Sequence, residues 1–195
     1  MENFLLYSSV SLLLILLGIA GYLFFRLRMV RKLAITDEHS GIMNYRGLQS
    51  CFKKIVRKYP VSSMALIDID NFRSFNEESY ALGDAVLKEF SVFINGVLPK
   101  NSVFARFRIG DEFIIIFKNT TFSNAEKRLE EIKQQCRNHS FECLNAFPDH
   151  RISFTEGMVE LNTGQNDIEK YLLTTEINLK KNKLTGTTRE KFISG

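Results

Sequence analysis

Four acidic residues lie in two short segments that could together form a site for a metal ion and phosphates. Asp68 and Asp70 end an apolar run, and Asp111 and Glu112 separate two runs rich in β-forming residues. If these runs are neighbours in one sheet, Asp68 and Asp111 converge on one edge. Close carboxylates repel each other unless a cation lies between them, and hard oxygen ligands favour Mg²⁺ or Mn²⁺. Such a metal can bind nucleotide phosphates and activate a ribose hydroxyl. The alternative is that these acids are simply solvated.

The sequence gives little support for a zinc site, a disulfide scaffold or a nucleic-acid-binding surface. Cys51, Cys136 and Cys143 form no C-x-x-C pair, and the three histidines add no ligand spacing, so structural zinc and a disulfide scaffold are disfavoured. The net charge is +4, but four of the 26 basic residues lie in segment 26–32. The chain after this segment holds 22 basic and 21 acidic residues. A nearly neutral domain argues against nucleic-acid binding.

Helices and strands alternate around the acidic segments. Apolar residues at helical spacing predict four helices, and short β-rich runs predict four strands. The order α-β-α-β-β-α-β-α predicts an α+β fold of the ferredoxin-like, palm type, with helices on one face of a mainly antiparallel sheet. The helices are expected over residues 48–59, 83–97, 125–136 and 168–181, and the strands over 63–69, 103–108, 113–117 and 151–159.

An uncharged stretch over residues 4–25 is dominated by Leu, Ile, Val and Phe. At about 1.5 Å per residue it crosses a hydrocarbon core of about 30 Å. A cleaved signal peptide is the alternative, but its positive charge precedes a shorter apolar stretch. Here Glu2 precedes the stretch and RLRMVRK follows it. We therefore predict one transmembrane helix, with the anchor and its basic flank over residues 1–32 and a cytoplasmic domain over residues 33–195.

Six segments, in order and at similar spacing, resemble the GGDEF family of diguanylate cyclases. Asp37–Arg46 resembles D-x-L-T-G-L-x-N-R-R, and Asp68–Glu77 matches D-[IL]-D-x-F-K-x-[IY]-N-D. Gly83–Leu87 matches G-D-x-x-L, and Ile109–Phe113 stands in the position of the signature. Ser153–Gly157 resembles the T-x-S-I-G strand, and Lys183–Gly186 resembles the A-K-x-x-G turn.

The resemblance implies a metal site and a catalytic centre. Asp68, Asp111 and the backbone carbonyl of Ile69 would hold Mg²⁺ or Mn²⁺. Asp111 would also lie beside the attacking 3′-hydroxyl as catalytic acid or base, and Glu112 would be a second acid at the metal. Arg73, where the family has Lys, would neutralise charge that develops on the phosphates.

The resemblance also implies a substrate and partners. Asn76 and Asp84 would hydrogen-bond the guanine of GTP, and Lys183 would face its phosphates. Each domain would hold one GTP, so a two-fold homodimer would be needed to form cyclic di-GMP and release pyrophosphate. The anchor would lie in a bacterial inner membrane, through residues 4–25.

Several positions depart from the family pattern. Ile109 stands in place of the first signature glycine, or one glycine is deleted if Arg108 matches the family's arginine. The stretch 77–82 is one residue shorter than the family loop and lacks its Gly-His pair, and Thr187 replaces a late arginine. Lys100–Val103 stands where an inhibitory R-x-x-D would lie, so product feedback is not expected. Two alternatives therefore remain: a degenerate domain that binds GTP without turnover, and a synthase of another cyclic dinucleotide.

Overall fold

The chain divides into two compact units, Met1–Ile35 and Thr36–Gly195. The structure is a computed structural model that describes residues 2–108, 110–162 and 165–193; for residues 2–6, 8–11 and 186–193 it describes the backbone alone. The first unit is a single helix, α1 (Glu2–Ile35). Within α1, Leu12–Ile35 has a mean hydropathy of 1.9 and is long and apolar enough to cross a membrane. Its assignment as an anchor, and that of the second unit as a cyclase domain, stay predictions.

The second unit contains a five-stranded sheet with the order β1-β3-β4-β2-β5. Its strands are β1 (Met43–Asn44), β2 (Ser62–Ile69), β3 (Ser102–Arg106), β4 (Glu112–Lys118) and β5 (Phe154–Leu161). The short β1 runs parallel to β3, and all other neighbours are antiparallel. The mainly antiparallel α+β sheet is therefore confirmed, with β2 inside the sheet between β4 and β5.

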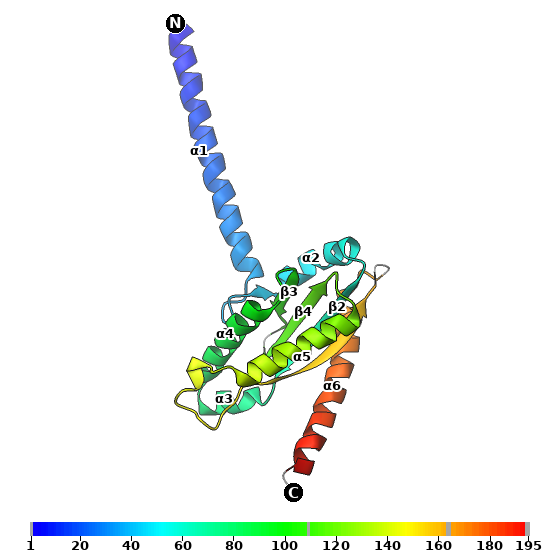
Figure 1. The fold of residues 1–195 in the computed structure, drawn as a ribbon. Helices are drawn as coiled ribbons and strands as arrows, with labels where there is room; N and C mark the ends of the chain where they lie inside the picture. Colours follow the sequence, from blue (N-terminus) through cyan, green and yellow to red (C-terminus); the bar gives the residue numbers. More distant parts are fainter. Residues whose placement is uncertain (1, 109, 163–164, 194–195) are drawn as a thin grey trace. The chain divides into compact units, whose positions relative to one another are not determined.

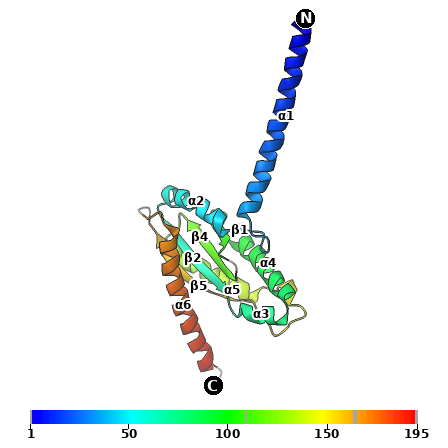
Figure 2. The same cartoon turned by 180° about the vertical axis from the view of Figure 1, so that it is seen from behind.

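Helices cover both faces of the sheet (Figures 1 and 2). On one face, α4 (Tyr80–Val97) and α5 (Phe122–Asn138) pack on odd-numbered β2 residues such as Ile67. On the other, α2 (Tyr45–Lys58) and α6 (Ile168–Ile193) pack on even-numbered residues such as Leu66. The expectation of helices on one face is therefore wrong. All eight residues of β2 are buried, as expected of a strand that is covered on both sides.

Local signals explain where several helices begin. The Asn44 side chain accepts a hydrogen bond from the Gly47 backbone N–H at 2.9 Å and caps α2, which begins three residues before the expected start. The Ser79 hydroxyl accepts from the Leu82 N–H at 3.0 Å and caps α4. Between β2 and α4 lies a helix that the apolar spacing did not predict, α3 (Phe72–Glu78). A single 3₁₀ turn, Glu142–Leu144, precedes β5.

The last helix is longer than expected. α6 continues through Lys183 and Gly186, so the turn expected at Lys183–Gly186 is wrong. α6 lies against β5, where a Cβ on Gly157 would collide with backbone atoms of Thr175 and Leu179. Glycine at this position therefore permits the close approach of helix and strand that sets where Lys183 lies.

Candidate functional site

The acidic segments meet at one end of the sheet, as predicted. Asp68 lies opposite Glu112 in the antiparallel register of β2 and β4. One residue further, the backbone N–H of Ile69 donates to the carbonyl of Asp111 at 3.2 Å. The N–H and C=O groups of a strand residue point to the same neighbouring strand. The carbonyl of Ile69 therefore also faces the side on which Asp111 lies.

A lysine from the far end of the sequence completes this cluster. The ammonium Nζ of Lys183 on α6 lies 2.6 Å from Oδ1 of Asp68. The Asp68 side chain is 12% exposed, whereas the Lys183 side chain is 42% exposed. Glu176, also on α6, lies 3.5 Å from Arg108, which follows β3. Lys183 was expected at this site, facing the phosphates, whereas Glu176 was not foreseen from the sequence.

Acidic side chains outnumber basic ones in this cluster. Burial raises the pKa of Asp68, as do the charges of Asp111 and Asp70, and the Lys183 ammonium opposes this rise. Burial also raises the pKa of Glu112, followed by repulsion from Asp68, Asp111 and Glu176. The cluster therefore holds more negative charge than the protein itself compensates, which is the condition under which a cation is attracted.

The donor groups present fit a hard divalent cation. In the described part of the chain, no three His, Cys, Asp or Glu side chains stand close enough to hold a metal by themselves. Magnesium often needs only one or two carboxylates, because waters and substrate phosphates supply the other ligands. The Lys183 ammonium on Asp68 shows that a cation is accommodated at this carboxylate. Asp68, Asp111 and the Ile69 carbonyl supply oxygen donors that suit Mg²⁺ or Mn²⁺.

Asp70 has a different role from Asp68. Its two carboxylate oxygens accept hydrogen bonds from the hydroxyls of Ser153, at 2.6 Å, and Thr155, at 2.7 Å. Its backbone N–H donates to the carbonyl of Ser153 at 2.9 Å. Asp70 therefore holds the start of β5 against the end of β2.

The two residues expected to read the base lie close to one another. Asn76 is on α3 and Asp84 is in the first turns of α4. A Cβ on Gly83 would collide with the amide of Asn76, so that side chain packs directly against the backbone before Asp84. Asp84 is 59% exposed and contacts Nδ1 of His39 at 3.2 Å. The structure thus brings this pair together on one surface, but with a histidine that was not singled out from the sequence.

Arg73 lies outside the acidic cluster. Its Nε donates to Glu77 at 2.8 Å within α3, and its side chain is 90% exposed. Ile109 lies outside the described residues, as does the side chain of Thr187.

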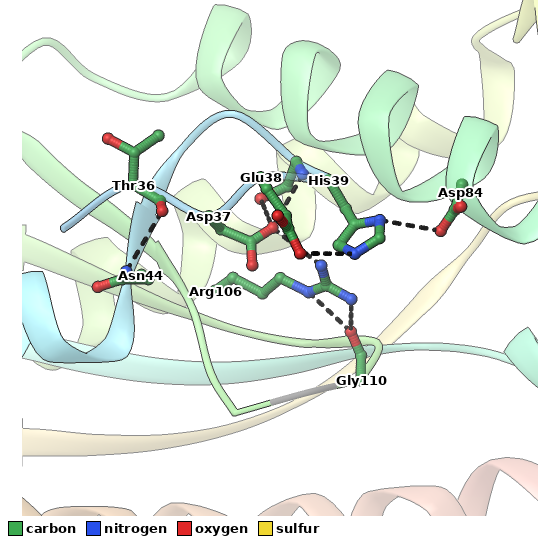
Figure 3. A network of polar contacts seen from close by, with 9 residues as sticks. Thr36, Asp37, Glu38, His39, Asn44, Asp84, Arg106 and Gly110 are labelled. Carbon is green, nitrogen blue, oxygen red and sulfur yellow. Dashed lines mark hydrogen bonds and ion pairs between the residues drawn. The ribbon is translucent and has the colours of Figure 1, made fainter. Parts of the chain in front are cut away.

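The hairpin before Asp111 is fixed by a buried arginine that sequence reasoning also missed. Nε and Nη2 of Arg106 donate to the carbonyl of Gly110 at 2.9 and 2.7 Å, and Nη1 donates to Asp37 at 2.8 Å (Figure 3). Asp37 also accepts from the backbone and hydroxyl of Ser40. Burial alone would raise the pKa of Asp37, but these hydrogen bonds and the Arg106 charge lower it. The sequence signal for this role of Arg106 was its position at the end of a predicted strand, beside the acidic tip of the hairpin.

Comparisons with known proteins identify the family of the chain. Residues 34–189 match the family model described as the diguanylate cyclase GGDEF domain. The response regulator PleD of Caulobacter vibrioides is 27% identical over 148 residues, which cover 73% of this chain and 32% of PleD. A diguanylate cyclase of Vibrio cholerae is 29% identical over 163 residues, 81% of this chain and 49% of the relative. The chain thus spans about a third of the length of one relative and about half that of the other.

Solved structures share the fold. The coiled coil and GGDEF domain of DgcB from Caulobacter crescentus, in complex with c-di-GMP, has a TM-score of 0.75 at 22% identity, covering 87% of this chain and 91% of that one. The active GGEEF domain of a diguanylate cyclase from Vibrio cholerae has a TM-score of 0.64 at 28% identity, covering 73% and 92%. From the family match, which spans most of the sequence, the chain belongs to the GGDEF domain family.

Proposed function

We propose that the chain is a membrane-anchored diguanylate cyclase that condenses two GTP molecules into cyclic di-GMP and releases pyrophosphate. The observation that carries this proposal is the acidic cluster at the end of β2 and β4, where Asp68 faces Glu112 and binds the Lys183 ammonium. Membership of the GGDEF family supports the reaction class. The same fold in a relative that is an active cyclase, at 28% identity, is consistent with it.

In this proposal Asp68, Asp111 and the Ile69 carbonyl hold Mg²⁺ or Mn²⁺, with Glu112 as a second acid beside them. A metal ion held by these residues would supply positive charge that offsets the triphosphate and favours ionisation of the attacking hydroxyl. Asp111 accepts the proton of the 3′-hydroxyl. Lys183, whose ammonium pairs with Asp68, would neutralise negative charge on the phosphates.

The remaining residues bind and orient the substrate. Asn76 and Asp84 hydrogen-bond the guanine edge, and the Asp84 carboxylate accepts from N1–H and N2–H. Arg73, exposed on α3, turns towards the phosphates once GTP is bound.

Two domains are needed because each GTP is both nucleophile and electrophile. The 3′-oxygen of one GTP forms a bond to the α-phosphorus of the other, and the bond from that phosphorus to the β-phosphate bridging oxygen breaks. Each of the two attacks releases one pyrophosphate and one proton. A two-fold homodimer places the two sites face to face for this reciprocal transfer.

Anchoring through residues 4–25 in a bacterial inner membrane, with the domain in the cytoplasm, belongs to the same proposal. Its support is the length and hydropathy of α1 and the basic residues after the apolar stretch. A membrane protein of Staphylococcus aureus is 31% identical over 102 residues, 51% of this chain and 28% of the relative. Protease protection in inverted membrane vesicles tests the orientation, and a domain resistant to added protease would contradict it.

The function is tested by incubating the full chain, purified in detergent, with Mg²⁺ and each nucleoside triphosphate in turn. Mass spectrometry of the products should show cyclic di-GMP and pyrophosphate from GTP, and neither from Asp68→Asn. Glu160→Gln, which removes an exposed charge on β5, serves as the matched control and should behave as wild type.

The two alternatives give different results in the same assay. Binding of GTP with no product would identify a degenerate nucleotide-binding domain. A cyclic product that contains another base would identify a different cyclic-dinucleotide synthase. Absence of both binding and product would refute a nucleotide-binding function altogether.

A further inference from the structure

His39 bridges two carboxylates at the surface that we propose to bind guanine. Its Nδ1 lies 3.2 Å from Oδ1 of Asp84, and its Nε2 lies 3.5 Å from Oε1 of Glu38 (Figure 3). The side chain of His39 is 45% exposed and that of Asp84 is 59% exposed. The contact therefore lies where a ligand from solvent can reach both groups.

The loop that carries His39 is tightly fixed. The backbone N–H of Asp37 donates to the carbonyl of Ile42 at 2.8 Å, and the N–H of Gly41 donates to the carbonyl of Asp37 at 2.9 Å. Gly41 has a φ of 71°, in the left-handed region that glycine adopts without strain. The Asp37–Arg106 ion pair joins the same loop to β3. These contacts define the turn that places His39 against Asp84 on α4.

The protonation state of His39 decides how it can interact with its neighbours. A neutral imidazole has one donor nitrogen, whereas the charged ring has two and can donate to both carboxylates at once. The charged groups around the ring are Glu38 on its own loop, Asp84 and Lys88 on α4, and the mutually paired Asp37 and Arg106 behind it.

We propose that His39 is a specificity-determining residue that competes with guanine for the carboxylate of Asp84. This inference rests on the proposed function, because it takes Asp84 as the acceptor for guanine N1–H and N2–H. The charged ring donates to the oxygen that the base requires, so guanine binds less tightly at acidic pH. The neutral ring keeps a single donor and no charge, so it holds this oxygen more weakly and guanine affinity recovers. The position corresponds to the leucine of the D-x-L-T motif, a side chain that cannot compete in this way.

The test compares the full-length protein with His39→Leu, which restores the residue of the motif. Binding of 3′-deoxy-GTP with Mg²⁺ is measured by titration calorimetry at pH 6.0 and pH 8.0; this nucleotide lacks the attacking hydroxyl and is not consumed. Inorganic triphosphate is titrated in parallel, because it binds the phosphate site without a base. It reports the pH dependence of the acidic cluster and of the phosphates alone.

The two proteins should bind 3′-deoxy-GTP within about twofold of each other at pH 8.0. At pH 6.0 His39→Leu should bind it about three- to fivefold more tightly than wild type, the range expected for a solvent-exposed ion pair. Inorganic triphosphate should show the same pH dependence in both. In an Asp84→Asn background, His39→Leu should no longer change the pH dependence, because the shared carboxylate is gone.

Equal pH dependence of 3′-deoxy-GTP binding in wild type and His39→Leu would overturn the role of His39 while leaving the proposed function intact. A difference that persists in the Asp84→Asn background would also overturn it, since the effect would not pass through Asp84. If wild type binds neither 3′-deoxy-GTP nor triphosphate at pH 8.0, the proposed function itself fails, and this inference fails with it.

Discussion

Nη1 of Arg106 lies 2.8 Å from Oδ1 of Asp37, although the two residues are 69 positions apart in the sequence. Their side chains are 7% and 17% exposed, so this ion pair is largely buried. The same guanidinium holds the carbonyl of Gly110, next to Asp111. The pair therefore couples the first loop of the domain to the position of the proposed catalytic acid.

Replacing Arg106 by Met should lower the free energy of unfolding by about 3–5 kcal/mol, because it leaves Asp37 as a buried charge without its partner. Urea denaturation of the full chain in detergent measures this loss. Arg137→Met removes an exposed arginine of α5 and should change stability by less than about 0.5 kcal/mol.

The stability that the pair confers should depend on pH in one direction. The pKa of Asp37 is lowered in the folded protein, so the contribution is present above the ordinary aspartate pKa and is lost as pH falls through the lowered value. The destabilisation by Arg106→Met should therefore shrink towards pH 2.5. A constant difference between pH 7 and pH 2.5 would show that packing, and not charge, is what the mutation removes.

Glu112→Gln should stabilise the metal-free protein at pH 7, by about 0.5–1 kcal/mol given that solvent screens this half-buried site. The pKa of Glu112 is raised by burial and by three neighbouring acids, so its ionised form is unfavourable in the folded state. The gain should vanish below the ordinary glutamate pKa, where the carboxyl is neutral in both folded and unfolded chains.

Thermal unfolding between pH 4 and pH 7 without divalent ions is the measurement. Added Mg²⁺ should then raise the melting temperature of wild type more than that of Glu112→Gln. A variant less stable than wild type at pH 7 would mean that Glu112 is already compensated within the protein.

Gly157→Ala should lower stability by about 1–3 kcal/mol, because its Cβ would collide with the backbone of α6 at Thr175 and Leu179. Since α6 carries Lys183, nucleotide affinity should fall as well. Gly96→Ala on α4, where a Cβ meets no atom within 4 Å, is the matched control and should not destabilise the protein. Urea denaturation measures the stability of both variants, and nucleotide titration measures their affinity. Equal stability of the two variants would contradict the close contact between α6 and β5.

Much of the fold follows from local patterns in the sequence. The continuous apolar run Met64–Ile67 predicts a buried strand, and apolar spacing predicts α2, α4, α5 and the start of α6. The same run shows why the expectation of helices on one face of the sheet is wrong. A strand without alternating polar residues is buried on both faces and requires helices on both sides of the sheet. Helix α3 has only one buried apolar residue, Phe75, and therefore gives no periodic signal.

Residues of the site could be predicted only where sequence motifs or the expected fold place them. The meeting of Asp68 with Asp111 and Glu112 follows from the fold type, in which the first long strand lies beside the hairpin. The contacts made by Arg106 and His39 depend on side chains that meet across distant parts of the chain, and no local spacing encodes them.

Asp68→Asn should abolish Mg²⁺-dependent nucleotide binding, whereas Asp70→Asn should mainly lower stability, by about 1–3 kcal/mol. Asp68 faces the cluster and Lys183, while both oxygens of Asp70 are engaged by Ser153 and Thr155. Titration calorimetry with 3′-deoxy-GTP and urea denaturation of both variants separate the two roles. Equal losses of binding would show that Asp68 is not the principal metal ligand.

The most direct test of the account is the rate at which the full chain converts GTP with Mg²⁺ to cyclic di-GMP, compared with that of Asp111→Asn. Removing one positioned electrostatic group at a reaction centre typically costs about 10²–10³ in rate. We therefore predict cyclic di-GMP from wild type and a rate lower by that factor in Asp111→Asn, with both proteins folded. Cyclic di-GMP formed equally fast by both, or no cyclic di-GMP from a wild-type protein that binds GTP, would contradict the account.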